Sequence, residues 1–132
     1  MSDVIVTCNG CFDGLHPGHL FYLGFCRAQG NILIVGLNSD EHIRACKGRE
    51  PIPLWERMAA IAELKVASQV LSFREPDPRA FLRRVKPDIH CIGEEYFGRA
   101  IEEETCRELG ITIVWVPRIG KWSSTLLRGT HE

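Results

Sequence analysis

The sequence lacks the features of a membrane-spanning or secreted chain. No apolar stretch approaches the roughly 20 residues that a spanning helix needs, and no signal-peptide pattern opens the chain. Internal repeats and low-complexity tracts are missing as well. These absences lead us to expect a cytoplasmic protein without a membrane partner.

An excess of charge of either sign is also missing. The 132 residues contain 16 lysines and arginines against 17 aspartates and glutamates. This balance argues against a broad nucleic-acid or membrane-binding surface, but it leaves room for a local anion pocket. With 45% hydrophobic residues at this length, the chain is expected to form a single domain over residues 1–132.

A disulfide framework is not expected, although six cysteines occur. They are scattered along the chain, as is typical of reduced and partly buried thiols in a cytoplasmic domain. Cys8 and Cys11 form a C-x-x-C pair, which leaves a redox or metal motif open. A zinc site would need further ligands at local spacing, so no set of metal ligands is predicted.

Strand-like and helix-like segments alternate along the chain. The expected strands are 4–8, 32–37, 70–73, 89–92 and 111–116, and the expected helices are 20–28, 54–64, 77–85, 100–109 and 123–128. Polar residues 42–53 are expected to form a connection, and His90 is expected to lie in the core or on a sheet face. The alternation predicts an α/β fold, a single Rossmann-like domain with a five-stranded, mainly parallel sheet and helices on both faces.

A glycine-rich turn joins the first expected strand to the first expected helix. Residues 9–19 contain three glycines and two histidines. Such a turn exposes backbone N–H groups beside the positive end of a helix, and this combination attracts phosphate. His16 and His19 are three residues apart, so both imidazoles can face one anion if the helix begins near Pro17. The glycine spacing fits neither a P-loop nor the G-x-G-x-x-G pattern.

Two motifs at opposite ends of the chain carry a family resemblance. The pattern G-x-F-D-x-x-H-x-G-H resembles the signature of the cytidylyltransferase-like nucleotidyltransferases, and it is formed by Gly10, Phe12, Asp13, His16, Gly18 and His19. The run 122–125 is similar to their second signature, which opens the final helix, although Lys121 and Trp122 separate Gly120 from the serines.

The middle of the chain narrows the resemblance. Residues 38–40, 47–49, 51, 56–58, 73, 86–88, 93 and 96 resemble the adenylyltransferase domain of bacterial ADP-heptose synthase and its relative, glycerol-3-phosphate cytidylyltransferase. Residues 116–118 with Gly120 partly match an Arg-Thr-Glu-Gly run of the latter family, but the Thr-Glu pair is absent. The base of the nucleotide therefore stays open between adenine and cytosine.

The resemblance implies an enzyme that joins a nucleoside triphosphate to a phosphorylated small molecule and releases pyrophosphate. ATP and a sugar phosphate such as a heptose 1-phosphate are the preferred substrates. CTP with glycerol 3-phosphate or a similar polyol phosphate is an alternative, and a non-catalytic nucleotide-binding module is a second one. The implied cofactor is Mg²⁺, which needs few protein ligands when it bridges phosphate oxygens. A homodimer is the implied assembly, and no nucleic-acid partner is expected.

The resemblance also implies a role for each residue of the site. The catalytic residues are His16, His19 and Lys47, which stabilise charge on the phosphates. The nucleotide-binding residues are Gly10, Cys11, Phe12, Gly18, Arg118, Ser123, Ser124 and Thr125. The residues that bind the second substrate are Asp13, Asp40, Arg57 and Glu94.

Ordinary structural roles remain open for several of these side chains. Lys47 is also consistent with a solvated loop lysine, and Arg57 with an ion pair to a neighbouring glutamate on its helix. Asp13 is equally consistent with a turn residue that accepts hydrogen bonds from nearby N–H groups. Asp40 and Glu94 are equally consistent with solvated loop carboxylates.

Overall fold

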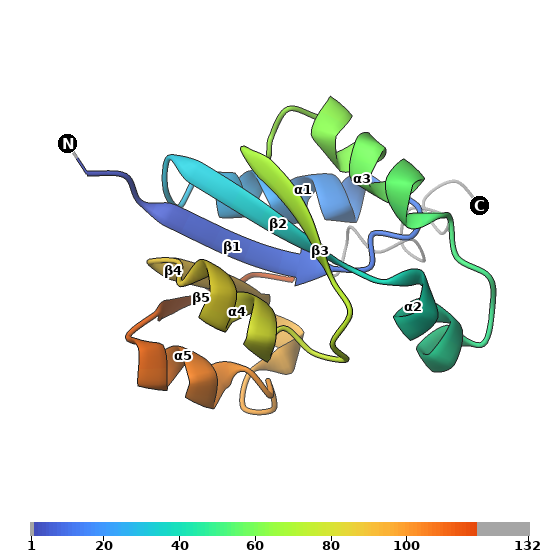
Figure 1. Ribbon diagram of the computed structural model, residues 1–132. Coiled ribbons are helices and arrows are strands. Elements are labelled where there is room, and N and C mark those ends of the chain that lie inside the picture. The colour runs from blue at the N-terminus through green and yellow to red at the C-terminus, as the bar shows by residue number, and fades with distance from the viewer. Residues whose placement is uncertain (1, 119–132) are drawn as a thin grey trace.

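The computed structural model describes residues 2–118, which form one parallel sheet with helices packed on it (Figure 1). The strands are β1 (Ile5–Gly10), β2 (Ile32–Asn38), β3 (Gln69–Phe73), β4 (Ile89–Gly93) and β5 (Thr112–Val116). The helices are α1 (Pro17–Arg27), α2 (Asp40–Lys47), α3 (Leu54–Glu63), α4 (Arg79–Val85) and α5 (Glu103–Leu109), with a short 3-10 helix η1 (Glu94–Tyr96).

The order of the strands creates a switch point beside β1. The sheet runs β3-β2-β1-β4-β5, and every neighbouring pair is parallel. The chain therefore builds outward from β1 to β3 and then crosses to the other side of β1 for β4. In open parallel sheets, ligands bind beyond the carboxyl ends of the strands at such a point. The ends of β1 and β4, at Gly10 and Gly93, therefore mark where a site is expected.

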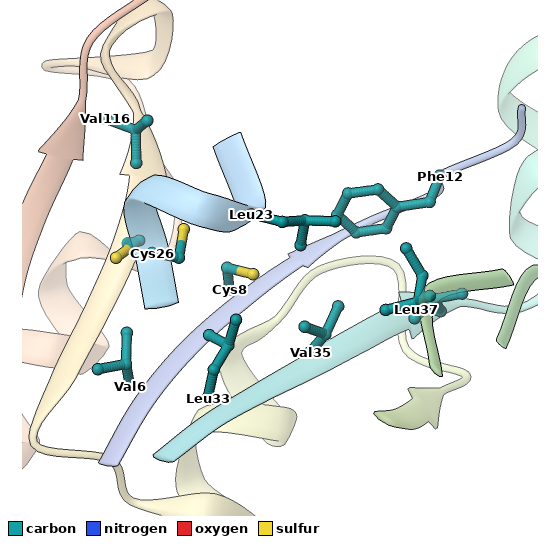
Figure 2. Packing of buried hydrophobic residues seen from close by; sticks show 11 residues of the cluster. Val6, Cys8, Phe12, Leu23, Cys26, Leu33, Val35, Leu37 and Val116 are labelled. Atoms are coloured by element: carbon teal, nitrogen blue, oxygen red, sulfur yellow. The ribbon is translucent and has the colours of Figure 1, made fainter. Parts of the chain in front are cut away.

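Helices cover both faces of the sheet, as predicted. In Figure 1, α1 and α3 lie on one face, while α4 and α5 lie on the other. Figure 2 shows Leu23 and Cys26 of α1 against the side chains that β1 and β2 turn toward it, among them Cys8 and Val35. Side chains on alternate positions of a strand point to opposite faces, so Ile34 packs instead on the far side of the sheet.

The sequence predicted most elements within a few residues, but it missed α2. Residues 42–53 were expected to form a connection, whereas Asp40–Lys47 is helical. The end signals of this helix are clear, because Ser39 caps its N-terminus and Gly48 ends it in the left-handed conformation. Only Ile43 of the helix is buried, so the hydrophobic pattern that reveals most helices is nearly absent.

The smaller differences are shifts of element ends. Strand β1 continues through Asn9 and Gly10, and α5 begins at Glu103 rather than at residue 100. The expected helix over 123–128 lies outside the described residues. Across residues 2–118, no helix combines the length and the hydropathy that crossing a bilayer requires.

Candidate active site

The glycine-rich turn leaves the carboxyl end of β1 and enters α1 at the switch point of the sheet. Pro17 is the first residue of α1, and its fixed φ suits that position. His16 is the N-cap, with an extended backbone. The sequence motif therefore lies where the topology alone predicts a ligand.

The two histidines of the turn form a reciprocal cap. His16 Nδ1 accepts a hydrogen bond from the Gly18 N–H at 3.0 Å, and His19 Nδ1 accepts one from the His16 N–H at 3.3 Å. These bonds assign the ring proton of each neutral imidazole to Nε2. The rings are stacked with their centroids 3.8 Å apart. Each ring therefore presents one Nε2–H donor, and neither Nε2 has a hydrogen-bond partner within residues 2–118.

His19 is held in its neutral form. Burial lowers its pKa to about 4, and the charges of His16 and Lys47 act in the same direction. At neutral pH the ring is therefore a hydrogen-bond donor without a full charge of its own. Lys47, at the end of α2, supplies positive charge near the same turn.

Phe12 packs its ring against the ring of His19. Its backbone has φ +47°, which is uncommon for a residue with a bulky side chain, and its ring is nearly buried. The ring meets His19 edge to face with centroids 5.4 Å apart and lies near Tyr22. A Cβ on Gly10 would lie 3.0 Å from the Phe12 ring, so a larger residue there would require the ring to shift by a few tenths of an ångström.

Arg57 is almost completely buried at the base of the site. Its Nε donates to the Ile52 carbonyl at 2.7 Å, and its Nη1 donates to the carbonyls of Cys11 and Asn38, each at 2.9 Å. Its Nη2 donates to Asp40 Oδ1. This geometry differs from the expected contact with a substrate phosphate, because the guanidinium is engaged by protein groups and is 1% exposed. It joins the turn after β1 to the end of β2 and the start of α3.

The carboxylates of Asp13 and Asp40 also contact the protein rather than open solvent. Asp13 Oδ1 accepts from the Ile52 N–H at 2.8 Å, and its Oδ2 pairs with Arg49. Although burial opposes it, the bond from Ile52 and the charge of Arg49 lower the pKa of Asp13. Asp40 Oδ2 accepts from the Leu54 N–H at 3.3 Å while Oδ1 binds Arg57. Asp13 therefore holds the connection between α2 and α3 against the turn, and Asp40 joins the start of α2 to the start of α3.

Two cavities meet at the histidines. The first has a volume of about 420 Å³ and lies between the turn, α1 and the ends of β4 and β5. Of the expected nucleotide-binding residues, it is lined by Gly10, Cys11, Phe12, Gly18 and Arg118. Ser123, Ser124 and Thr125 lie outside the described residues.

The second cavity has a volume of about 730 Å³ and lies on the other side of the turn. The two cavities overlap, because nine residues line both of them, among them Gly10, Cys11, Phe12, His16 and His19. The second cavity adds Asp13, Lys47, residues 76–78 and residues 99–102. Glu94 is exposed on η1 and lines neither cavity, whereas its neighbour Glu95 lines the first.

The C-x-x-C pair is divided between two environments. Cys8 is fully buried in β1 and packs in the core under α1, while Cys11 lies on the turn with its Sγ 3.7 Å from Asn38 Oδ1. Burial raises the pKa of the Cys11 thiol. No group of three His, Cys, Asp or Glu side chains suited to a metal ion occurs within residues 2–118.

Two residues of the site escaped sequence reasoning. Arg49, the ion-pair partner of Asp13, was noted as a basic residue of a polar stretch and as part of the family resemblance, but no role in the site was assigned to it. Glu102 was seen only as part of a charged helix, yet it lines the second cavity and contacts buried His90. Their charges were visible in the sequence, but their partners are 36 and 12 residues away.

The chain is similar in sequence and in fold to known proteins. The cytidylyltransferase-like family matches residues 7–128. Curated relatives named "Bifunctional protein HldE" are 46% identical over 97 residues in Pseudomonas paraeruginosa and 43% identical over 97 residues in Psychromonas ingrahamii. These matches cover 72% of this chain but 20% of each relative, so the chain spans about a fifth of their length.

A solved structure matches over nearly its whole length. The lipopolysaccharide core biosynthesis protein from Thermoplasma volcanium has a TM-score of 0.72 and 33% identity, with 89% of this chain and 97% of that chain covered. The family match and these relatives support nucleotidyltransferase activity. The two-motif signature, the parallel sheet and the family match together establish that the chain belongs to the cytidylyltransferase-like family.

Proposed function

We propose that the protein transfers a nucleoside monophosphate from a nucleoside triphosphate to a phosphorylated sugar or polyol and releases pyrophosphate. One observation carries the proposal: the stacked rings of His16 and His19, each with an Nε2–H donor, line both cavities. Each cavity is large enough for one small substrate. In a transfer reaction, the nucleotide and the acceptor must both lie next to the groups that stabilise the transferred phosphate. Two cavities that share His16 and His19 meet this requirement.

The proposed step is a direct displacement at phosphorus. An oxygen of the acceptor phosphate attacks the α-phosphorus, the bond from that phosphorus to the bridging oxygen breaks, and pyrophosphate leaves with its electron pair. The attacking phosphate oxygen is already deprotonated, so the protein does not need a general base. Its tasks are to align the two substrates and to stabilise charge on the equatorial oxygens.

The residues of the site divide into two kinds under this proposal. His16 and His19 donate to phosphate oxygens in the transition state, and Lys47 neutralises the phosphates from the second cavity. Arg118 and the backbone of the turn hold the nucleotide in the first cavity. Arg57, with Asp13 and Asp40, is a positioning residue that fixes the turn.

ATP as donor and a sugar phosphate as acceptor are the preferred pair. The middle of the chain resembles the adenylyltransferase domain of ADP-heptose synthase, and the relatives named HldE match that part of the chain. The neighbour from Thermoplasma volcanium is named for lipopolysaccharide core biosynthesis, which involves sugar chemistry. CTP with a polyol phosphate is the competing pair.

Mg²⁺ and a homodimer belong to the same proposal. The donor set proposed to contact the phosphates, which is His16, His19 and Lys47, carries no negative charge, and the carboxylates of Asp13 and Glu102 in the second cavity lie outside it. Residues 2–118 hold no cluster of metal-ligating side chains. This donor set fits a Mg²⁺ ion that is held mainly by the phosphates of the nucleotide. Such an ion would neutralise charge on the phosphate oxygens.

Pyrophosphate release tests the proposal. The protein is mixed with Mg²⁺ and either ATP or CTP, together with a panel of sugar and polyol phosphates, and pyrophosphate is measured with a coupled assay. We expect release that depends on the acceptor and is faster with ATP. Faster release with CTP would instead favour CTP and a polyol phosphate as the two substrates. Nucleotide binding without release for any acceptor would instead identify a non-catalytic binding module.

A further inference from the structure

Glu102 places a carboxylate in the far wall of the second cavity. It is the N-cap residue of α5, and it is 8% exposed. A buried carboxylate needs partners that replace water, because an unpaired one costs several kcal/mol. The partner found here is a hydrogen-bond chain through a histidine and a threonine rather than a lysine or arginine.

That chain runs through the sheet. The fully buried His90 of β4 has its Nε2 3.3 Å from Glu102 Oε2 and its Nδ1 2.8 Å from Thr7 Oγ1 of β1. A carboxylate oxygen only accepts, so the His90 Nε2 carries the proton, and Nδ1 then accepts from the Thr7 hydroxyl. Every member of the chain has one consistent role. The chain fixes the orientation of the Glu102 carboxylate from behind.

The second carboxylate oxygen has no partner from the protein. No hydrogen bond within residues 2–118 reaches Glu102 Oε1. Glu102 Oε1 is not among the fully enclosed side-chain atoms of residues 2–118 that lack a hydrogen-bond partner, so it keeps some contact with solvent. Glu102 lines the second cavity and its Oε2 is held by His90, so Oε1 is the carboxylate oxygen that is available to a ligand there.

The cationic side chains that line the second cavity make no hydrogen bond or ion pair with Glu102 within residues 2–118. Lys47 ends α2, and the Arg99 guanidinium lies 5.2 Å from the centre of the Tyr96 ring and donates from Nε to the Glu95 carbonyl. A phosphate suits the cations, but it has no proton to give to Glu102. A hydroxyl group suits Glu102, because it donates to the carboxylate.

We propose that Glu102, held by His90 and Thr7, binds hydroxyl groups of the acceptor and makes the second cavity selective for polyhydroxylated phosphates. The inference rests on the proposed function, because it concerns the acceptor side of the same site. A ligand that lacks the hydroxyl leaves Oε1 without a donor in a largely desolvated wall. Sites of this kind reject such analogues more strongly than apolar pockets reject a size difference.

Binding of matched ligands tests the proposal without any turnover. The probes are sn-glycerol 3-phosphate against n-propyl phosphate, and D-ribose 5-phosphate against 2-deoxyribose 5-phosphate, each titrated by calorimetry into the full chain. We expect the wild-type protein to bind at least one hydroxylated probe about tenfold or more tightly than its deoxy counterpart. Equal affinities within both pairs, or no binding of any probe, would overturn the inference.

Variants of Glu102 identify the group that is responsible. In Glu102→Gln, the amide oxygen accepts from His90 and the amide NH₂ faces the cavity, so an acceptor becomes a donor. We expect the preference for hydroxylated probes to fall to about threefold or less. Glu104→Gln, an exposed change two residues along the chain, is the matched control and should keep the wild-type preference. A preference that survives in Glu102→Gln would overturn the inference.

Folding and turnover are checked separately. Unchanged melting temperature and unchanged affinity for a non-hydrolysable ATP analogue show that Glu102→Gln keeps its fold. If that variant does not fold, Glu102→Asp takes its place, because the shorter side chain cannot reach both His90 and the cavity. A Glu102-dependent preference without pyrophosphate release would support the inference and contradict nucleotidyl transfer. Pyrophosphate release together with a preference for hydroxylated probes that does not depend on Glu102 would support nucleotidyl transfer and contradict the inference.

Discussion

The imidazoles of His16 and His19 are stacked 3.8 Å apart, and their Nδ1 atoms accept hydrogen bonds from the backbone N–H groups of Gly18 and His16, respectively. The same contacts that hold the start of α1 therefore direct two Nε2–H donors to one place. Structure and proposed chemistry depend on the same two side chains, so a substitution affects both. The two effects can be separated by the choice of the replacement.

Replacement of His19 should reduce the rate of transfer far more than the stability. Removing one donor to the transition state is expected to cost about 3 to 4 kcal/mol, or a few hundred-fold in kcat. His19→Ala loses both the donor and the cap, whereas His19→Gln keeps an acceptor for the His16 N–H. We expect both variants to be slow in a pyrophosphate-release assay and His19→Gln to melt closer to the wild type. A loss of less than tenfold in both would show that His19 is not a transition-state donor.

The depressed pKa of His19 should make the protein less stable in mild acid. Burial lowers this pKa to about 4, whereas the unfolded chain has a value near 6.5. Between these values the unfolded state binds more protons, so stability falls as the pH drops from about 6.5 to 4 and is unaffected by His19 above that range. After allowance for solvent screening at this partly exposed ring, the loss is about 1 to 2 kcal/mol.

The measurement is the difference between two unfolding curves. Urea denaturation of the wild type and of His19→Gln is followed from pH 4 to 8, so that carboxylates common to both proteins cancel. The wild type should lose stability relative to the variant as the pH falls. Parallel curves across this range would show that His19 titrates normally.

The sequence predicted the order of elements and the position of the phosphate-binding turn because both depend on local signals. Apolar runs identify the strands, and the sequence around His16 identifies the start of α1. Helix α2 was missed because only Ile43 of it is buried, so its hydrophobic pattern is weak. The local end signals at Ser39 and Gly48 were present, and more weight on them would have found this helix.

The partners of charged side chains could not be read from the sequence. Arg57 has the same spacing to the glutamates of its own helix as any surface arginine, yet its donors go to groups as distant as Cys11. The guanidinium is buried because the segments around Cys11, Asn38 and Ile52 come together around it only in the folded chain. The same holds for Glu102. The sequence correctly predicted that His90 lies in the core or on a sheet face, but it gave no indication that His90 contacts Glu102.

The C-x-x-C spacing should be incidental to activity. The Cys11 thiol contacts Asn38 Oδ1 at 3.7 Å, and burial raises its pKa, which disfavours the thiolate that metal binding and redox chemistry require. Cys11→Ser can still donate to Asn38 and should retain activity within about twofold. Steady-state rates and metal analysis of the purified protein check this. Abolished activity, or zinc that disappears with the thiol, would restore the metal or redox interpretation.

Replacement of Arg57 separates a positioning role from direct phosphate binding. Arg57→Ala removes the donor to Asp40 Oδ1 and the donors to the carbonyls of Ile52 and Asn38, so the free energy of unfolding should fall by about 3 to 5 kcal/mol. Arg57→Lys keeps the charge but not the planar set of donors and should lose less. The matched control is Arg107→Ala, because Arg107 is largely exposed with one ion pair at 4.0 Å. That change should cost under about 1 kcal/mol.

The kinetics of the same variants complete the test. A positioning residue acts on both substrates through the shape of the turn, so Arg57→Lys should lower kcat together with stability. A phosphate-binding arginine would instead give a stable Arg57→Ala protein with a raised KM for one substrate. Because four donor contacts of the guanidinium go to protein groups, we expect the first outcome. A stable Arg57→Ala variant with a higher KM would mean that these contacts exchange for phosphate when substrate binds.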